Sequence, residues 1–467
     1  MMSLKKGSLN AAQAGTYYEE KYTQDDYYTE EQRVTGQWLG QGAARLGLAG
    51  DVSREDFSAL LQGIHPRSGA VLVAKASGYG EHAAGWDGVF NAPKSVSIQA
   101  LIGDDYRLLE AHKAAVGRAL EEVEKYAMAR QHGGRELIAT ANVTAAAFTH
   151  LAARPVEEVG HGPDPHLHTH VVFLNVTTRP DRAIRALSPV EIYRSQELGS
   201  AVYRSELALA VQRLGYRINV TAGNGPWELD GYTREQVMAF SERRRQIEEK
   251  MEELGVSGPK AAQLVTLATR QSKEQYDEHE LKAEWKTRAA EYGIDAKRHL
   301  WQALGRNGSS VDPTPGTAHD ALQFAKAHTT NREAVVDRRD LEVAALQHGM
   351  RRASIDSVRR EMGIEEQAQR LVRAQEPDFR HPQGSFTTPE MLALELQNVA
   401  MMRAGQGQAH PIALPVVAEN WGQRQGLSGE QIGAMQMMLA SPNWITALDA
   451  IAGSGKTTTV GALRQLA

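Results

Sequence analysis

Three histidines alternate with other residues at positions 166, 168 and 170, and an apolar run, Val-Val-Phe-Leu at 171–174, follows at once. A β-branched and aromatic run of this kind predicts a buried strand. Because successive strand residues point to opposite faces, His166, His168 and His170 would share one face. Neutral imidazoles on a common face can converge on a divalent metal ion, so this segment predicts both a strand and a metal centre.

Two tyrosine pairs, Tyr17-Tyr18 and Tyr27-Tyr28, lie near the start of the chain. A phenol ionises near pH 10 and is a poor nucleophile at neutral pH, unless a nearby cation favours the phenolate or a carboxylate takes its proton. A metal ion could also neutralise the charge of a phosphate and hold it in line for attack. Tyrosines beside a metal therefore favour phenolate attack on a phosphodiester, and two pairs would allow a strand to pass from one tyrosine to another.

The composition is that of a globular protein with two or three domains, since the chain has 467 residues, of which 42% are hydrophobic and 23% charged. The absence of cysteine excludes disulfides and thiolate metal sites. No apolar stretch resembles a signal peptide or a membrane span, which predicts a cytoplasmic protein without membrane insertion. The net charge of −5 does not by itself indicate a nucleic-acid partner. Basic clusters at 243–245 and 351–352 are candidates for phosphate contact, although a solvated helix face is the commoner role of such runs.

Four regions are expected along the chain: a mixed domain at 1–304, a linker at 305–317, a helical segment at 318–374 and a final domain at 375–467. In the first region, strands are predicted at 71–76, 95–102, 137–148 and 167–176, with a helix at 105–131. Capping boxes that begin at Ser188 and Thr233 predict helices at 188–214 and 238–254. The linker is rich in glycine and proline. The fold class is thus α/β (α+β), a palm with helices appended towards its C-terminal side.

The last region ends in a phosphate-loop pattern. A strand is predicted at 443–448, and Gly453, Gly455, Lys456 and Thr457 follow it before an apolar helix start. In this context backbone amides would cradle phosphates, the lysine would reach the β and γ oxygens, and the threonine would hold Mg²⁺. Ala450 replaces the glycine usual at the first position of the loop.

Several stretches together resemble the conjugative relaxases of the TrwC/TraI type (MobF class), within the HUH endonuclease superfamily. The resemblance covers most of residues 1–300 and is carried by Tyr17-Tyr18-Glu19-Glu20, Asp26-Tyr27-Tyr28, the segment Asp-Gly-Val-Phe-Asn-Ala-Pro-Lys-Ser-Val-Ser at 87–97, Phe148-Thr149-His150, and Asp-Pro-His-Leu-His-Thr-His at 164–170. It implies an antiparallel-sheet relaxase palm with helical C-terminal fingers.

The resemblance also implies an activity. Such an enzyme nicks one strand at a plasmid transfer origin, remains on the 5′ phosphate through a tyrosine and accompanies the strand to the recipient cell. Tyr17 would attack first, with Tyr18 as its neighbour, and Tyr27 with Tyr28 would serve the second transfer. Asp87 matches the acid that orients or deprotonates. The metal ligands would be His150, His168 and His170, whereas strand geometry alone allows His166 as the third; the resemblance makes His166 a flanking residue.

The implied cofactors and partners follow from the same resemblance. The ion would be Mg²⁺ or Mn²⁺ by abundance, and the three nitrogen ligands would also suit Zn²⁺ or Ni²⁺ in vitro. The DNA would be a single strand with a hairpin at the transfer origin, assisted by relaxosome accessory proteins and a secretion coupling protein. Gln431 resembles the adenine-reading glutamine of superfamily 1 helicases related to RecD, and its alternative role is a capping box with Ser428. We expect a truncated helicase start, with ATP and Mg²⁺ bound only by a full-length helicase.

Three other functions compete with this interpretation. A rolling-circle replication initiator or HUH transposase would use the same chemistry. A metal-dependent hydrolase would activate water at the histidines and form no covalent adduct. A non-catalytic DNA-binding module would need neither Tyr17 nor His168.

Overall fold

The computed structural model describes the chain in segments, and its contacts divide these into two compact units, Met1–Phe386 and Thr387–Ala467. The described residues are 1–4, 9–10, 36–73, 83–131, 136–153, 156, 160–221, 225–258, 261–262, 264–265, 277–306, 315–378 and 381–466. The helical segment expected at 318–374 belongs to the first unit. The two units are described separately.

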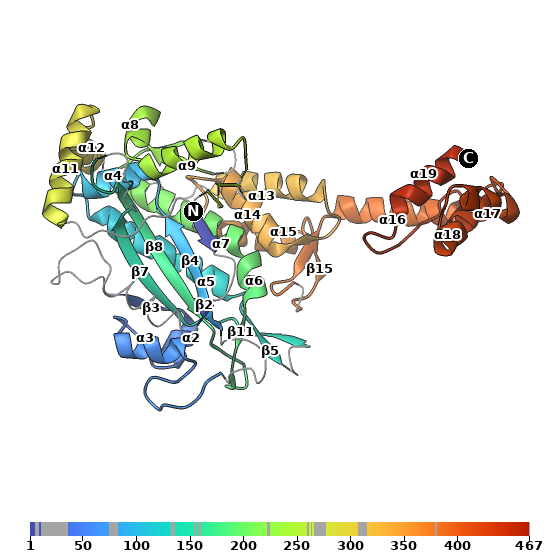
Figure 1. Cartoon of the computed structure of the whole chain (residues 1–467), viewed down its shortest axis with the longest axis horizontal. Helices are drawn as coiled ribbons and strands as arrows, with labels where there is room; N and C mark the ends of the chain where they lie inside the picture. Colours follow the sequence, from blue (N-terminus) through green and yellow to red (C-terminus); the bar gives the residue numbers. More distant parts are fainter. Residues whose placement is uncertain are drawn as a thin grey trace. The chain divides into compact units, whose positions relative to one another are not determined.

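The first unit is built on an antiparallel sheet with strand order β1-β4-β8-β7-β3, and β2 also pairs with β4 (Figure 1). The strands are β1 (Met2–Leu4), β2 (Leu9–Asn10), β3 (Gln37–Leu39), β4 (Ala83–Asn91), β7 (Ala145–Ala152) and β8 (Pro165–Leu174). The strand predicted at 167–176 is therefore confirmed as β8, the central strand. It pairs with β4 on one side and β7 on the other.

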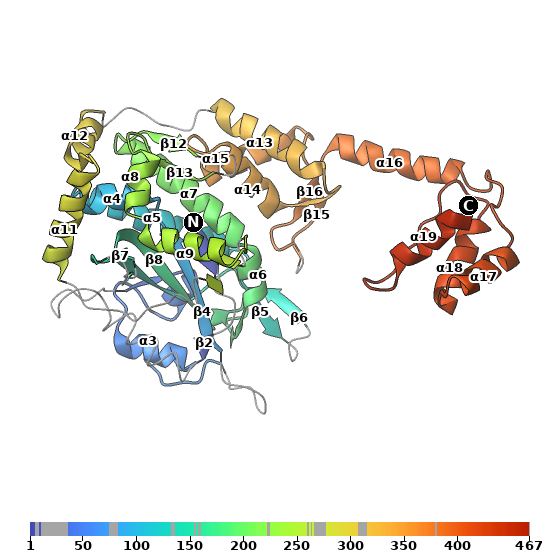
Figure 2. The ribbon, with the colours of Figure 1, turned by 45° about the horizontal axis from the view of Figure 1, so that its top comes forward.

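The two faces of this sheet have different partners. On one face, Phe90, Leu167, Val171 and Phe173 belong to a large apolar core with helices α5 (Arg107–Glu124) and α7 (Gln196–Arg213). On the other face, Ala146, Phe148, Val172 and Leu174 form a second core with α3 (Arg54–Leu61). Figure 2 shows the sheet between α3 and the longer helices. The part of this second face near the start of β8 carries polar side chains instead.

Smaller elements surround the sheet. Beside it lie the strands β5 (Met128–Gln131), β6 (Glu136–Ala139), β9 (Thr177–Thr178), β10 (Ile184–Arg185), β11 (Leu187–Ser188), β12 (Ile218–Val220) and β13 (Trp227–Leu229). The helices are α2 (Gln41–Arg45), α4 (Lys94–Leu101), α6 (Pro189–Arg194), α8 (Arg234–Ala239), α9 (Glu242–Glu253), α11 (Glu278–Glu291) and α12 (Ala296–Arg306).

Two of the predicted strands are wrong in the described residues. The segment 95–102 forms helix α4, and every residue from Ser95 to Leu101 is buried. A helix buried on all sides shows no 3.6-residue alternation of apolar and polar residues, so its sequence reads like a buried strand. In the segment 71–76, Val71 makes only an isolated bridge to Ile64, and residues 74–76 lie outside the described part.

Strand β4 was not predicted. Its sequence, Ala-Ala-Gly-Trp-Asp-Gly-Val-Phe-Asn, contains alanines and glycines that have low strand propensity. Pairing with β8 over seven positions, from Gly85 opposite Leu174 to Asn91 opposite His168, gives it strand structure. Tertiary pairing here overrides local preference.

Other expected elements are interrupted. The strand predicted at 137–148 divides into β6 and β7, with Ala141 between them at φ +50°. The helix at 105–131 ends at Glu124, and β5 follows. The helix at 188–214 forms but breaks at Ser195. The Ser188 side chain makes no capping bond there, and the Glu191 carboxylate forms ion pairs with Arg194 and Arg339.

The capping box at Thr233 is confirmed, with bonds to and from Gln236. It begins α8, which ends at Ala239, and a separate helix, α9, covers most of the segment predicted at 238–254. The boundary between the two helices lies at Phe240 and Ser241.

The predicted helical segment after the linker contains α13 (Pro315–Thr330), α14 (Arg338–His348) and α15 (Ile355–Gln367), with a small sheet of β14 (Val336–Asp337), β16 (Ser385–Thr387) and β15 (Val372–Gln375). Buried ion pairs attach this segment to the palm. Arg359 contacts Glu122 of α5 at 2.5 Å and Glu342 of α14 at 2.7 Å, and both carboxylates are fully buried. The pair with Glu122 connects α15 to α5, and the pair with Glu342 connects α15 to α14.

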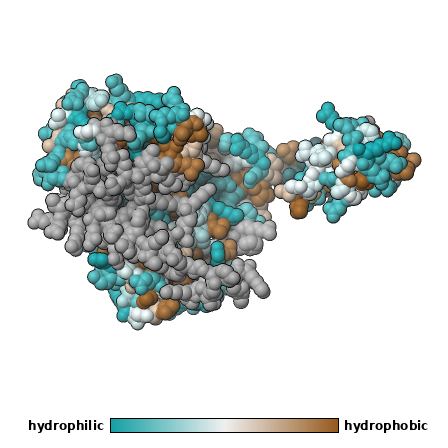
Figure 3. Space-filling view, viewed as in Figure 1, coloured by the Kyte–Doolittle hydropathy of each residue, from teal (hydrophilic) through white to brown (hydrophobic). Residues whose placement is uncertain are grey.

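The second unit is a small helical group of α16 (Pro389–Ala404), α17 (Pro415–Arg424), α18 (Gly429–Leu439) and α19 (Lys456–Leu466). Thr388 caps α16 through its side chain, which accepts from the backbone N–H of Met391. The strand predicted at 443–448 does not form, since the second unit offers no neighbouring strand among its described residues to complete a ladder. Many apolar side chains are exposed here, among them Leu414 at 67% and Ile451 at 83%, and Figure 3 shows apolar patches on this unit. Among the described helices, none combines the length and apolar character needed to cross a membrane.

Candidate metal centre

The register of three strands brings the predicted histidine ligands together. His150 of β7 lies opposite His168 of β8, and Phe148 lies opposite His170. On the other side, Asn91 and Val89 of β4 lie opposite His168 and His170. Residues paired across an antiparallel sheet share a face, so His150, His168 and His170 all project from the polar part of the second face.

The three imidazole rings form a nearly equilateral triangle. Their centroids are 5.2 Å apart for His150 and His168, 5.3 Å for His150 and His170, and 5.3 Å for His168 and His170. An ion about 2.1 Å from each ligating nitrogen, held at tetrahedral angles, would place the centroids about 5 Å apart. The ring centres are therefore spaced as they would be around a shared divalent ion, although in this arrangement no choice of one nitrogen from each ring places all three within 4.8 Å of one another.

Hydrogen bonds orient two of these rings for metal binding. The Nδ1 of His168 lies 2.9 Å from the carbonyl oxygen of His166, which can only accept, so this Nδ1 carries the proton. The Nδ1 of His170 lies 2.9 Å from Oδ1 of Asp87 and donates to the carboxylate. Both rings then keep the lone pair on Nε2 for a metal. Burial, followed by the neighbouring histidines, lowers the pKa of His168 well below its usual value, which keeps the ring neutral.

Asp87 lies on β4 and is 1% exposed. A buried carboxylate behind a histidine fixes the tautomer of the ring and increases its basicity. The structure thus places Asp87 where it orients His170. The sequence alone left open whether Asp87 orients another group of the site or removes a proton.

His166 lies beside the triangle. Its ring stacks on that of His168 with centroids 4.7 Å apart, and its Nε2 lies 3.0 Å from Oδ1 of Asn91. The amide oxygen accepts, so Nε2 of His166 carries the proton and is not free to bind a metal. Its Nδ1 has no hydrogen-bond partner among the described residues. His150 forms the triangle with His168 and His170, and its role as the third ligand stays a prediction of the family resemblance.

The segment that leads into β8 is held by α11. Arg288 donates to Oδ1 of Asp164 at 2.9 Å, and Trp285 donates through its indole nitrogen to the carbonyl of Pro163 at 2.8 Å. Lys94 of α4 donates to the carbonyl of Pro165 at 2.9 Å. Burial lowers the pKa of Lys94 to about 8, against the opposing effect of Asp164 and Glu228. These contacts fix the chain just before the first histidine of β8.

The remaining candidates near the palm divide into two groups. Tyr17, Tyr18, Tyr27 and Tyr28 lie outside the described residues. The basic cluster at 243–245 lies on α9, where Arg244 pairs with Glu248 and Arg245 with Glu242. These intrahelical ion pairs fit the solvated helix face that such runs commonly form.

In the second unit the phosphate loop is formed without its strand. Gly453 and Gly455 have φ values of +85° and +80°, which glycine adopts readily, and Lys456 begins helix α19. The ammonium of Lys456 donates to the carbonyl of Ile451 at 3.0 Å and also to that of Ala450. Thr457 is exposed in the first turn of the helix.

Gln431 forms the predicted capping box and also contacts the phosphate loop, while its adenine-reading role stays a prediction. It forms the capping box with Ser428, accepting from the backbone amide of Ser428 at 2.9 Å. Its Nε2 also donates to the carbonyl of Ser454 in the phosphate loop at 3.2 Å. The cap is thus real, and the side chain also reaches the loop.

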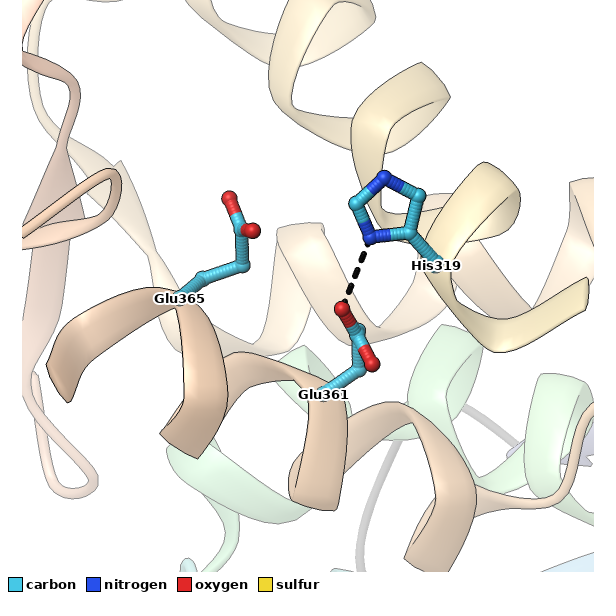
Figure 4. Close-up of side chains that lie close together, drawn as sticks. All are labelled: His319, Glu361 and Glu365. Atoms are coloured by element: carbon cyan, nitrogen blue, oxygen red, sulfur yellow. Dashed lines mark hydrogen bonds and ion pairs between the residues drawn. The ribbon is translucent and has the colours of Figure 1, made fainter. Parts of the chain in front are cut away.

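A second group of ligand-type side chains occurs at His319, Glu361 and Glu365, whose nearest ligand atoms lie within 4.8 Å of one another (Figure 4). His319 is hydrogen-bonded to Glu361 at 2.8 Å. Glu365 is fully buried and already accepts from Lys326 at 2.7 Å and from Arg370 at 2.8 Å. With its charge balanced by two cations, Glu365 connects α13 to α15 rather than holding a metal.

Comparison with known proteins agrees with this geometry. The TrwC relaxase family model matches residues 11–292. "Multifunctional conjugation protein TraI" of Escherichia coli is 35% identical over 319 residues, which is 66% of this chain and 17% of that protein. The same protein of strain K12 is 34% identical over 68% of this chain and 18% of its own length. This chain therefore aligns with less than a fifth of these relatives.

Solved structures of conjugative relaxase TrwC in complex with oriT DNA are also similar. A metal-free complex is 33% identical with a TM-score of 0.55, and a copper-bound complex is 35% identical with a TM-score of 0.56. A third complex holds a 27-mer DNA comprising the recognition hairpin and the cleavage site, at 34% identity and a TM-score of 0.55. Each covers 63% of this chain and is itself covered completely.

The antiparallel palm, with the residues that the family model matches, defines a protein of the relaxase fold class. The sequence match over residues 11–292 and the structural similarity identify the family within this class. The chain belongs to the TrwC relaxase family.

Proposed function

We propose that this chain is a conjugative relaxase that cuts one DNA strand at a plasmid transfer origin and keeps it as a 5′-phosphotyrosine. The observation that carries the proposal is the triangle of His150, His168 and His170, with Asp87 bonded to His170. Relatives of the same family are solved with oriT DNA, one of them with the recognition hairpin and the cleavage site.

The histidines, the tyrosines and Asp87 have different roles in the proposed reaction. His150, His168 and His170 would hold a divalent ion, which supplies positive charge to the scissile phosphate when bound. The phenolate oxygen of Tyr17 attacks phosphorus, the bond from phosphorus to the 3′ oxygen breaks, and that oxygen leaves with a proton as a 3′ hydroxyl. Tyr18 is its neighbour, and Tyr27 with Tyr28 receives the strand in the second transfer. Asp87 accepts from Nδ1 of His170 and would leave its Nε2 available to the ion.

The ion in the cell is Mg²⁺ or Mn²⁺ in this proposal. An all-nitrogen ligand set binds Zn²⁺, Ni²⁺ and Cu²⁺ more tightly, so abundance rather than affinity would select the ion. A copper-bound relative is consistent with this range.

The partners in this proposal are a single DNA strand with its hairpin, accessory proteins of the relaxosome, and a secretion coupling protein that sends the protein–DNA adduct from the donor cytoplasm to the recipient. Gly453, Gly455, Lys456 and Thr457, with Gln431 beside the loop, would bind ATP and Mg²⁺ when the rest of a RecD-like helicase supports them. The contact from Gln431 to Ser454 supports the assignment of this glutamine.

A denaturing gel tests the reaction. The full chain is mixed with Mn²⁺ and a single-stranded oligonucleotide from its neighbouring transfer origin, and a covalent protein–DNA adduct is the expected result. Tyr17→Phe and His168→Ala should abolish the adduct, while Tyr292→Phe, a surface tyrosine outside the site, should keep it. Free cleaved product without an adduct would indicate a metal-dependent hydrolase, and binding without cleavage a recognition module. Adduct formation on a replication origin instead would indicate a replication initiator.

A further inference from the structure

A buried hydroxyl lies directly behind the metal centre. Thr169 sits between His168 and His170 on β8, so its side chain projects from the opposite face, and it is 2% exposed. That face otherwise packs apolar side chains such as Leu167 and Val171 against α5 and α7. A polar group in such a core is retained only if it is hydrogen-bonded.

Thr169 is the middle of a chain of four buried or half-buried polar groups. Its Oγ1 lies 2.9 Å from Oγ1 of Thr149 and 2.8 Å from Nε2 of His112. The Nδ1 of His112 lies 2.7 Å from the hydroxyl of Tyr203. His112 and Tyr203 are both fully buried. The chain connects β7, β8, α5 and α7.

His112 stays neutral in this position. Burial, and then the positive charges of the N-terminus and Lys113, lower its pKa to about 3. A neutral imidazole has one N–H donor and one acceptor nitrogen, which matches two hydroxyl partners that can each donate or accept. Both ring nitrogens of His112 therefore have hydrogen-bond partners, although the ring is inaccessible to water.

The direction of these bonds matters for the metal centre. The hydrogen bonds between β4, β8 and β7 lie in the plane of the sheet and fix the register of the strands. The bond from His112 to Thr169 comes from the helical layer behind the sheet, and Thr169 is bonded in turn to its cross-strand neighbour Thr149. These two bonds fix the distance and the tilt of the strand backbone relative to the helical layer at Thr169 and Thr149. Thr169 lies between His168 and His170 in the chain, and Thr149 precedes His150.

We propose that His112 is a positioning residue for the metal centre, which it holds through Thr169 and Thr149 from the far side of the sheet. The proposal rests on His150, His168 and His170 being the metal ligands. His112 itself touches neither metal nor DNA. Its effect is to keep three imidazoles at the spacing that one ion requires, because loosely supported ligands bind metal less tightly.

The test is a Mn²⁺ titration of the full chain, followed by electron paramagnetic resonance of free Mn²⁺, with thermal unfolding in chelator measured in parallel. His112→Phe keeps an aromatic ring but removes both hydrogen bonds, and should weaken Mn²⁺ binding about 10-fold. His112→Gln keeps one donor and one acceptor and should restore most of the affinity. Tyr203→Phe removes a single hydroxyl and should have a smaller effect in the same direction.

Val116→Ala is the matched control. Val116 lies one turn further along α5, is 1% exposed and belongs to the same core. Its truncation should lower the unfolding temperature and leave Mn²⁺ affinity unchanged. Wild-type affinity in folded His112→Phe, or in Tyr203→Phe if the first variant does not fold, would overturn the proposal, and so would an equal loss in Val116→Ala. Unchanged Mn²⁺ binding in His168→Ala would instead overturn the metal assignment on which the proposal rests.

Discussion

The guanidinium of Arg288 lies 2.9 Å from the carboxylate of Asp164, two residues before the first histidine of the central strand. Both side chains are largely buried, with exposures of 11% and 4%. Arg288 also donates to the carbonyl of Ala239 at 2.8 Å and stacks over the ring of Phe240. One arginine of α11 thus connects the end of α8 to the segment that leads into the histidines of β8.

Replacement of Arg288 by methionine should lower the free energy of unfolding by about 3 kcal/mol, because it leaves the buried carboxylate of Asp164 without its cation. Urea unfolding followed by circular dichroism measures the change. Lys286→Met is the control on the same helix, since its pair with Asp104 is exposed and should contribute less than about 1 kcal/mol. An equal loss of unfolding free energy in the two variants would show that burial of the Arg288–Asp164 pair does not increase its contribution to stability.

Asp87→Asn should weaken Mn²⁺ binding about 10-fold, because the neutral amide no longer increases the basicity of His170. The carbonyl of the asparagine can still accept from Nδ1, so the fold should be retained. Calorimetric titration with Mn²⁺ gives the affinity, and Asp356→Asn, which removes a surface carboxylate that is 65% exposed, serves as the control. Affinity equal to that of the wild type would exclude Asp87 from the support of the metal.

The stability of the segment at 315–386 should depend on pH through Glu365. Burial opposes ionisation of this group, but hydrogen bonds from Arg370 and Lys326 outweigh it and lower its pKa to about 2. A carboxyl with a lowered pKa in the folded state stabilises the fold above its unfolded pKa of about 4.5 and loses that contribution as pH falls towards 2.

Glu365→Gln should therefore be less stable than the wild type at pH 7 by about 2 kcal/mol, the size of a hydrogen bond to a charged group. The difference should shrink between pH 4.5 and pH 2. Thermal unfolding across this range measures it, and Glu376→Gln, at a side chain that is 83% exposed, should show no comparable trend. A difference that is constant with pH would contradict the assigned ionisation.

The sequence predicted the features that follow from a local pattern. The apolar run after the alternating histidines predicted β8, and the capping box at Thr233 predicted the start of α8. The tyrosine pairs stay a prediction, since they lie outside the described residues. Strand alternation placed His168 and His170 on one face but could not choose between His150 and His166, because that choice depends on the register of β7 against β8.

Other features had no local signal. Helix α4 is buried on all sides, and β4 is a strand only because it pairs with β8. His112 lies in the segment predicted as a helix at 105–131, and Thr169 lies in the strand predicted at 167–176. Their contact joins residues far apart in the sequence, and hydrogen bonds of this kind leave no periodic pattern. Asn91 was within a recognised motif, but its bond to His166 depends on the pairing of β4 with β8.

The central claim is covalent attack by the leading tyrosine pair, and peptide mapping of the adduct tests it most directly. Trypsin cleaves after Lys6, Lys21 and Arg33, so Tyr17 and Tyr18 fall in peptide 7–21, whereas Tyr27 and Tyr28 fall in peptide 22–33. The adduct formed with transfer-origin DNA and Mn²⁺ is digested with trypsin and a nuclease, and the modified peptide is identified by mass spectrometry. We predict a nucleotide on peptide 7–21, at Tyr17. A first-round nucleotide on any other peptide, or cleavage without a modified peptide, would contradict the account.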